Sequence, residues 1–204
     1  ISGWNRCRLI LETIISQFDV LKTMTPRDFN EFRGFLKNAS GLQSYQFRAI
    51  EFVLGYKRKN ILYLYESYAA GYNMLISRLN SRSVIDHFYD FLEQNCVVIP
   101  LYLRERDVTL PHTPDKIIQN GILELYTKDP TFESLIEGMI NFDETYSKWR
   151  YVHWKTVERM IGNKIGTGGS TEADRNNNLP SENKFRMSVF LTFFQDLWEI
   201  RDKL

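Results

Sequence analysis

Cysteine and histidine are both scarce in this chain. Its 204 residues include two cysteines, Cys7 and Cys96, and three histidines. Two cysteines cannot build a disulfide framework, and no further cysteine stands near either one to complete a metal site, so we expect a reducing, cytoplasmic environment. The sequence also lacks any apolar run near the roughly 20 residues that a membrane-spanning helix needs. These absences argue against a disulfide scaffold and against a membrane protein.

An excess of charge of one sign is missing as well. The 26 Lys and Arg residues against 25 Asp and Glu residues leave a net charge of +1, whereas a protein that coats nucleic acid needs a concentrated basic face. Aromatic side chains, in contrast, are abundant: 14 Phe, 11 Tyr and 4 Trp. We therefore expect no nucleic-acid partner, and a globular chain with a sizeable core.

Helical periodicity dominates the chain. Apolar side chains recur at helical spacing in the ranges 4–23, 45–54, 84–95, 117–126, 131–139, 142–161 and 186–202. A further helix is predicted to begin at Pro26, because Thr25 can cap it and Asp28 suits the positive end of its dipole. The range 60–72 is aromatic and ambiguous. With no repeat and no linker, residues 1–204 are predicted to form one all-α domain, a helical bundle.

A polar tract near the C-terminal third, residues 166–184, contains Gly-Gly-Ser and Asn-Asn-Asn sequences and predicts a long exposed loop. Its start is not a phosphate-binding loop, because only three residues separate Gly162 from Gly166 and Thr167 stands where that motif has Lys. Two interpretations stay open: a flexible segment after a helix end, or glycine-rich backbone that approaches a ligand together with the Thr167 hydroxyl.

The three histidines have different surroundings in the sequence. His112 stands in a Pro-rich turn and is expected in solvent, while His87 could lie on the surface or between helices. His153 shares a helix face with Trp149 and Met160. It is either a hydrogen-bonded core residue or the single axial ligand of a haem iron, a role that needs one imidazole on a rigid helix in an apolar pocket. No second ligand at metal-binding spacing accompanies it, which disfavours zinc and non-haem iron.

Arg33 shares a predicted helix face with Phe29 and Leu36. Its side chain either lies along the helix edge with its charged end in water, or binds a carboxylate through its planar guanidinium. The sequence leaves both possibilities open. The charged residues that follow are expected to be ordinary solvated charges: Arg48, Glu51, Lys57, Arg58 and Lys59.

Two long blocks of the sequence resemble the tryptophan 2,3-dioxygenase family. The first runs from Leu21 to Glu51 and includes Ala-Ser-Gly-Leu-Gln-Ser-Tyr-Gln-Phe-Arg at 39–48. The second runs from Trp149 to Ser170, where it ends in Gly-Thr-Gly-Gly-Ser. Both blocks match in order and separation, and the similarity continues to the C-terminal helix, so it covers essentially the whole chain.

This resemblance implies an all-α, haem-dependent, cytoplasmic homotetramer. Members of the family insert O₂ into the indole ring of L-tryptophan and form N-formylkynurenine, in the kynurenine pathway of tryptophan catabolism. The implied cofactor is haem b, and the implied proximal ligand of its iron is His153. Trp149, Ser40 and Gly41 would belong to the haem pocket.

The resemblance also implies roles in substrate binding. Arg33 would bind the carboxylate of tryptophan through two charge-assisted hydrogen bonds. Thr167 would contact the ammonium and carboxylate groups, and Phe29 and Leu36 would form apolar walls of the indole pocket. A zwitterion with an apolar ring needs this combination of a charged group at one end and a dry pocket at the other.

The sequence departs from the family pattern in three places, and these differences limit which functional roles the resemblance implies. The upstream segment with a distal histidine in a His-Gln…Glu-Leu-Trp pattern does not occur in the chain, so we expect that segment to be missing and assign no catalytic residue. Phe29 stands where the family often has Tyr, and residues 171–176 replace a small apolar continuation after Ser170. The alternatives are a divergent or truncated haem-binding member with altered substrate or no activity, and a cofactor-free helical oligomerisation module.

Overall fold

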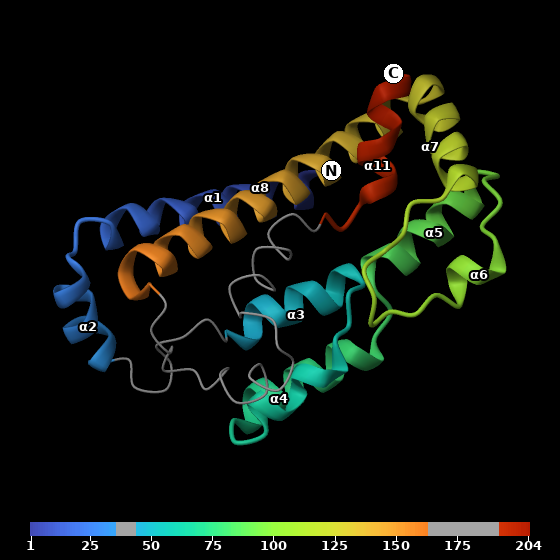
Figure 1. Cartoon of the computed structure of the whole chain (residues 1–204). Helices are drawn as coiled ribbons and strands as arrows, with labels where there is room; N and C mark the ends of the chain where they lie inside the picture. Colours follow the sequence, from blue (N-terminus) through green and yellow to red (C-terminus); the bar gives the residue numbers. More distant parts are fainter. Residues whose placement is uncertain (36–43, 163–191) are drawn as a thin grey trace. The chain divides into compact units, whose positions relative to one another are not determined.

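The computed structural model describes residues 1–35, 44–162 and 192–204, and these ranges are helical with no β-strand (Figure 1). Two compact units can be distinguished. The α1–α2 unit comprises residues 2–44 and 142–191, and the α3–α7 unit comprises Ile1 with residues 45–141 and 192–204. The boundary near residue 141 falls inside one continuous helix, α8 (Pro130–Ile161). The all-α fold class is confirmed, while a single domain over 1–204 stays a prediction.

Within the α1–α2 unit, helix α1 (Ser2–Leu21) lies along the C-terminal part of α8 (Figure 1). The ring of Trp4 packs on Phe142 with the centroids 5.2 Å apart, and the ring of Phe18 packs on His153 at 5.9 Å. Because both contacts advance in the same direction along the two helices, α1 and α8 run parallel.

Helix α2 (Pro26–Phe35) begins where the sequence predicts it. The Thr25 hydroxyl accepts a hydrogen bond from the backbone N–H of Asp28 at 3.2 Å, and the Asp28 carboxylate accepts one from the backbone N–H of Thr25 at 2.9 Å. This reciprocal capping box satisfies N–H groups that the first turn of a helix leaves without partners.

The α3–α7 unit contains a buried core shared by several short helices. Its elements are α3 (Tyr45–Leu54), η2 (Lys59–Tyr65), α4 (Ala69–Asn80), α5 (Val84–Gln94), α6 (Leu101–Arg104), α7 (Lys116–Lys128), the first part of α8, α11 (Gln195–Glu199) and η3 (Ile200–Lys203). Phe52 of α3, Tyr65 of η2 and Leu75 of α4 meet in one buried cluster. Leu197 and Ile200 of the C-terminal segment are also fully buried.

Most predicted helices are confirmed, but their number and ends differ in three places. The helices predicted at 131–139 and 142–161 are one helix, α8, because neither Gly nor Pro separates them. The last helix begins at Gln195, since residues 192–194 are not helical and bury Phe193 and Phe194 ahead of it. The range 60–72 holds η2 and the start of α4, and neither α4 nor α6 was predicted.

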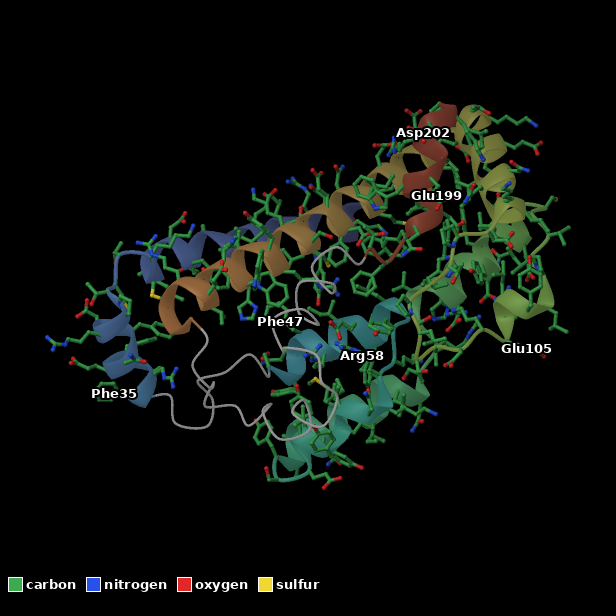
Figure 2. All side chains as sticks on the ribbon, viewed as in Figure 1. Phe35, Phe47, Arg58, Glu105, Glu199 and Asp202 are labelled. Atoms are coloured by element: carbon green, nitrogen blue, oxygen red, sulfur yellow. The ribbon has the colours of Figure 1, made fainter. Side chains whose placement is uncertain are left out.

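The expectation of ordinary solvated charges is wrong for most of the five residues concerned, Arg48, Glu51, Lys57, Arg58 and Lys59. Glu51 is buried and bonds to two guanidinium groups, Arg48 at 3.1 Å and Arg58 at 2.7 Å; Figure 2 labels Arg58 close to α3. Lys57 is buried as well, and its ammonium donates to backbone carbonyls at the end of α4. Lys59 alone is exposed. Buried charges persist only with such partners.

The expectation that His112 lies in solvent is also wrong. Its imidazole is buried, with Nε2 2.7 Å from a carboxylate oxygen of Asp196 in α11. The Pro-rich turn places His112 against the C-terminal segment, which sequence spacing does not reveal. His87, in contrast, is exposed on α5, which confirms the surface interpretation.

Candidate functional site

A row of aromatic side chains on α8 ends at His153. Tyr146, Trp149 and His153 are spaced three and four residues apart, so they lie on one side of the helix. The indole of Trp149 and the imidazole of His153 are stacked, with centroids 5.4 Å apart and planes 4° from parallel. Tyr146 contacts the Trp149 ring at 5.4 Å with a 45° tilt. The structure thus brings together the two residues that the sequence placed on one helix face.

The imidazole of His153 is enclosed on more than one side. Phe18 of α1 contacts it with a 60° tilt between the rings. The His153 Nδ1 atom is buried, while the residue as a whole is half-buried. Thr156 and Met160, in the next turns of α8, are buried too. The site therefore offers one imidazole in a largely aromatic environment.

The ligand chemistry at this point is that of a single nitrogen donor. Across the described ranges 1–35, 44–162 and 192–204, no group of three or more His, Cys, Asp and Glu side chains could hold a metal ion. Zinc and non-haem iron sites need three or four protein ligands. A haem iron needs only one protein ligand on its proximal side, because the porphyrin supplies four nitrogens.

Helix α2 carries the candidate substrate-binding residues Arg33 and Phe29. Both side chains are half-buried, and Phe29 contacts Phe32 with ring centroids 6.3 Å apart. Phe35, at the end of the helix, is exposed (Figure 2). Among the residues that the structure describes, none forms a hydrogen bond or ion pair with the Arg33 guanidinium.

Arg33 and His153 belong to the same compact unit. The Arg159 guanidinium, near the end of α8, donates a hydrogen bond to the backbone carbonyl of Lys22 at 3.4 Å, which ties this end to the turn between α1 and α2. Figure 1 shows α2 following that turn. The other sequence-predicted site residues, Leu36, Ser40, Gly41 and Thr167, lie outside the described residues.

The sequence reasoning missed the contact between Phe18 and His153. Phe18 falls in the range 4–23, whose apolar spacing predicts a helix, but the spacing of residues within one helix cannot identify a partner on another. The parallel pairing of α1 with α8 provides that information.

None of the helices that the structure describes combines the length and apolar character that crossing a membrane requires.

Comparison with known proteins identifies the family. The sequence model of the tryptophan 2,3-dioxygenase family matches residues 1–89 and 106–204. The tryptophan 2,3-dioxygenase of Herpetosiphon aurantiacus is 43% identical over 201 residues, which cover 98% of this chain and 72% of that protein. Those of Saccharopolyspora erythraea and Arthrobacter sp. strain FB24 are 36% and 35% identical over 202 residues, covering 98% of this chain and 69% and 68% of the relatives. The chain therefore belongs to the tryptophan 2,3-dioxygenase family.

Proposed function

We propose that the protein is a haem-dependent dioxygenase that inserts O₂ into the indole ring of L-tryptophan and yields N-formylkynurenine. It would act in tryptophan catabolism, in the kynurenine pathway. The observation that carries the proposal is the imidazole of His153, stacked on Trp149 and covered by Phe18 in the part of the chain that matches the family. One imidazole on a long helix is what the proximal side of a haem requires.

The residues present fit haem b as the cofactor. His153 would coordinate the iron through Nε2, while its Nδ1 atom stays buried within the protein. Trp149 would belong to the same pocket, as would Ser40 and Gly41 by their match to the family pattern. When bound, the haem supplies the oxygen chemistry, and the chain supplies binding, orientation and exclusion of water.

Substrate binding is assigned to four residues. Arg33 would hold the tryptophan carboxylate, since a guanidinium binds a carboxylate through two parallel hydrogen bonds. Thr167 would contact the ammonium and carboxylate groups. Phe29 and Leu36 would provide the apolar walls for the indole. Together they would fix the indole ring against the haem, and such orientation accounts for a large share of the rate in bound reactions.

The proposal includes a cytoplasmic homotetramer that binds neither nucleic acid nor membrane. Leu9, Ile10 and Val20 of α1 each expose about half of their surface, so an apolar face is available for subunit contacts. The net charge of +1 offers no basic excess for nucleic acid. Size-exclusion chromatography with light scattering measures the oligomeric state, and a monomer would contradict this part of the proposal.

The absorption spectrum of the purified, haem-loaded protein tests the central assignment. We expect a haem band in the wild type, its loss or a changed ligation state in His153→Ala, and an unchanged spectrum in His87→Ala, whose exposed histidine is the matched control. The same ligated spectrum in His153→Ala would exclude His153 as the ligand. A protein that takes up no haem would favour the cofactor-free alternative, and haem binding without conversion of tryptophan would favour a divergent member.

A further inference from the structure

The ring contacts of His153 differ in geometry. Its plane lies 4° from that of Trp149 but 60° from that of Phe18. A centroid separation of 5.4 Å falls in the range of offset stacking between aromatic rings. One turn of helix separates the two residues, so the indole lies directly against the face of the imidazole. Trp149 is therefore a flat surface on which the His153 ring rests.

The indole of Trp149 is itself held in place. Its side chain is 9% exposed, and the fully buried Tyr146 contacts it from the preceding turn at 5.4 Å. The guanidinium of Arg150 lies 4.6 Å from the centroid of the Tyr146 ring, within cation–π distance. The aromatic row thus presents a fixed plane to His153.

An imidazole needs such support if its direction matters. Rotation about the bond between Cβ and the ring is broad and roughly two-fold in histidine, so the backbone alone does not fix the ring plane. Stacking on a fixed indole limits this rotation to two orientations that share one plane. In the structure the ring occupies the orientation in which Nδ1 is buried.

We propose that Trp149 is a positioning residue that sets the plane of the His153 imidazole and thereby the direction of its Nε2 atom. The inference rests on the proposed function, in which Nε2 holds the haem iron. It changes the role of Trp149 from a wall of the haem pocket to a residue that acts through His153. Mutation of groups that orient a ligating histidine typically changes metal affinity or activity by roughly 10- to 100-fold.

Nuclear magnetic resonance of the haem-free protein tests the stacking directly. The chain has only three histidines, and the His153→Gln variant identifies the imidazole signals of His153. We expect these signals upfield of those of the exposed His87, because protons above an indole face are shielded. The upfield shift should vanish in Trp149→Leu and persist in part in Trp149→Phe, which keeps an aromatic plane. Nuclear Overhauser contacts between the two rings in the wild type need no variant, and their absence would overturn the proposal.

Trp154→Leu is the matched control. Trp154 is adjacent to His153 on α8, and its ring contacts include Tyr151 at 5.9 Å and Lys155 at 4.2 Å. The His153 signals should keep their upfield shift in this variant. An equal effect of Trp154→Leu and Trp149→Leu, or no effect of Trp149→Leu in a folded protein, would overturn the proposal.

The haem-loaded ferrous protein provides a second readout, the iron–histidine stretching band in resonance Raman spectra. We expect this band to shift or broaden in Trp149→Leu and to recover in Trp149→Phe, whereas a merely structural role would leave its position unchanged in every folded variant. An unchanged haem spectrum in His153→Gln would overturn the ligand assignment of the proposed function, while the stacking signals would still report on Trp149. The two failures are therefore distinguishable.

Discussion

The imidazole of His112 and the carboxylate of Asp196 lie 2.7 Å apart, with side chains 6% and 7% exposed, although 84 residues separate them in the chain. The second carboxylate oxygen of Asp196 accepts the backbone N–H of Asp115 at 2.7 Å. Asp115 in turn caps α7, accepting hydrogen bonds from the N–H groups of Ile117 and Ile118. One buried carboxylate thus joins the C-terminal helix α11 to the start of α7.

Replacement of Asp196 by Ala is expected to destabilise the protein by about 3 kcal/mol or more, because it leaves the buried His112 imidazole and the backbone N–H of Asp115 without their hydrogen-bond partner. Urea unfolding followed by circular dichroism measures this loss. Lys128→Ala is the control, since it removes an exposed ion pair with Glu124 and should leave the unfolding free energy near that of the wild type. A loss in Asp196→Ala as small as that of the control would show that the buried pair contributes nothing.

Replacement of Cys96 by Gly is expected to stabilise the protein by about 0.5–1 kcal/mol. Cys96 has a φ of 65° just after α5, and the N–H groups of Cys96 and Val97 bond to the carbonyls of Glu93 and Leu92. This is a Schellman motif, whose left-handed position costs an L-residue roughly 1–2 kcal/mol, partly offset by glycine's larger unfolded-state entropy. Cys96→Ala keeps the strain and should give no gain in urea unfolding. Equal stability of the Gly and Ala variants would contradict this explanation.

The helices could be predicted well where local signals act and poorly where tertiary contacts decide. Thr25, Pro26 and Asp28 mark the start of α2 in the sequence, and the capping box confirms it. Nothing local distinguishes His112, which a Pro-rich turn would leave in solvent, because its partner Asp196 is distant in the chain. The same holds for Glu51, whose burial depends on Arg58 beyond the end of α3.

The candidate site could be predicted to a similar extent. Helical spacing places Trp149 and His153 on one face, and the structure stacks their rings. Spacing alone favoured a core histidine over a haem ligand on that face, and the family resemblance reversed this preference. The contact of Phe18 with His153 requires the pairing of α1 with α8, which no pattern within either helix encodes.

Replacement of Arg33 by Ala is expected to weaken tryptophan binding by about 1.5–3 kcal/mol, the range for a hydrogen bond to a charged group. Arg33→Lys should recover only part of this, since an ammonium cannot form the two parallel bonds of a guanidinium. Calorimetric titration of the full-length, haem-loaded protein with L-tryptophan measures both changes. Arg27→Ala, an exposed arginine on the same helix, is the control and should bind as the wild type does. Wild-type affinity in Arg33→Ala would remove Arg33 from the substrate site.

Ser83 and Asp86 form a capping box at the start of α5. Through the Asp86 carboxylate, this capping box makes the free energy of unfolding depend on pH. The Asp86 carboxylate accepts the backbone N–H of Ser83 at 2.8 Å and pairs with Arg106 at 2.7 Å. Burial of Asp86 acts to raise its pKa, but the hydrogen bonds from Ser83 and Arg106 outweigh burial and hold the pKa below its usual 3.8. Because the folded pKa is lowered, the stabilisation is fully present above the unfolded value and is lost as the pH falls through the folded pKa.

Asp86→Asn should therefore be less stable than the wild type at neutral pH, and the difference should shrink once the pH falls below 3.8. Urea unfolding of both proteins at a series of pH values from neutral to about 3 measures it. Asp19→Asn is the control, because Asp19 is an exposed carboxylate paired only with Lys22 in α1 and its neighbouring turn, and the variant should stay close to the wild type throughout. A stability difference for Asp86→Asn that is constant over the whole series would mean that the side chain contributes through its shape and neutral hydrogen bonds, and not through its charge.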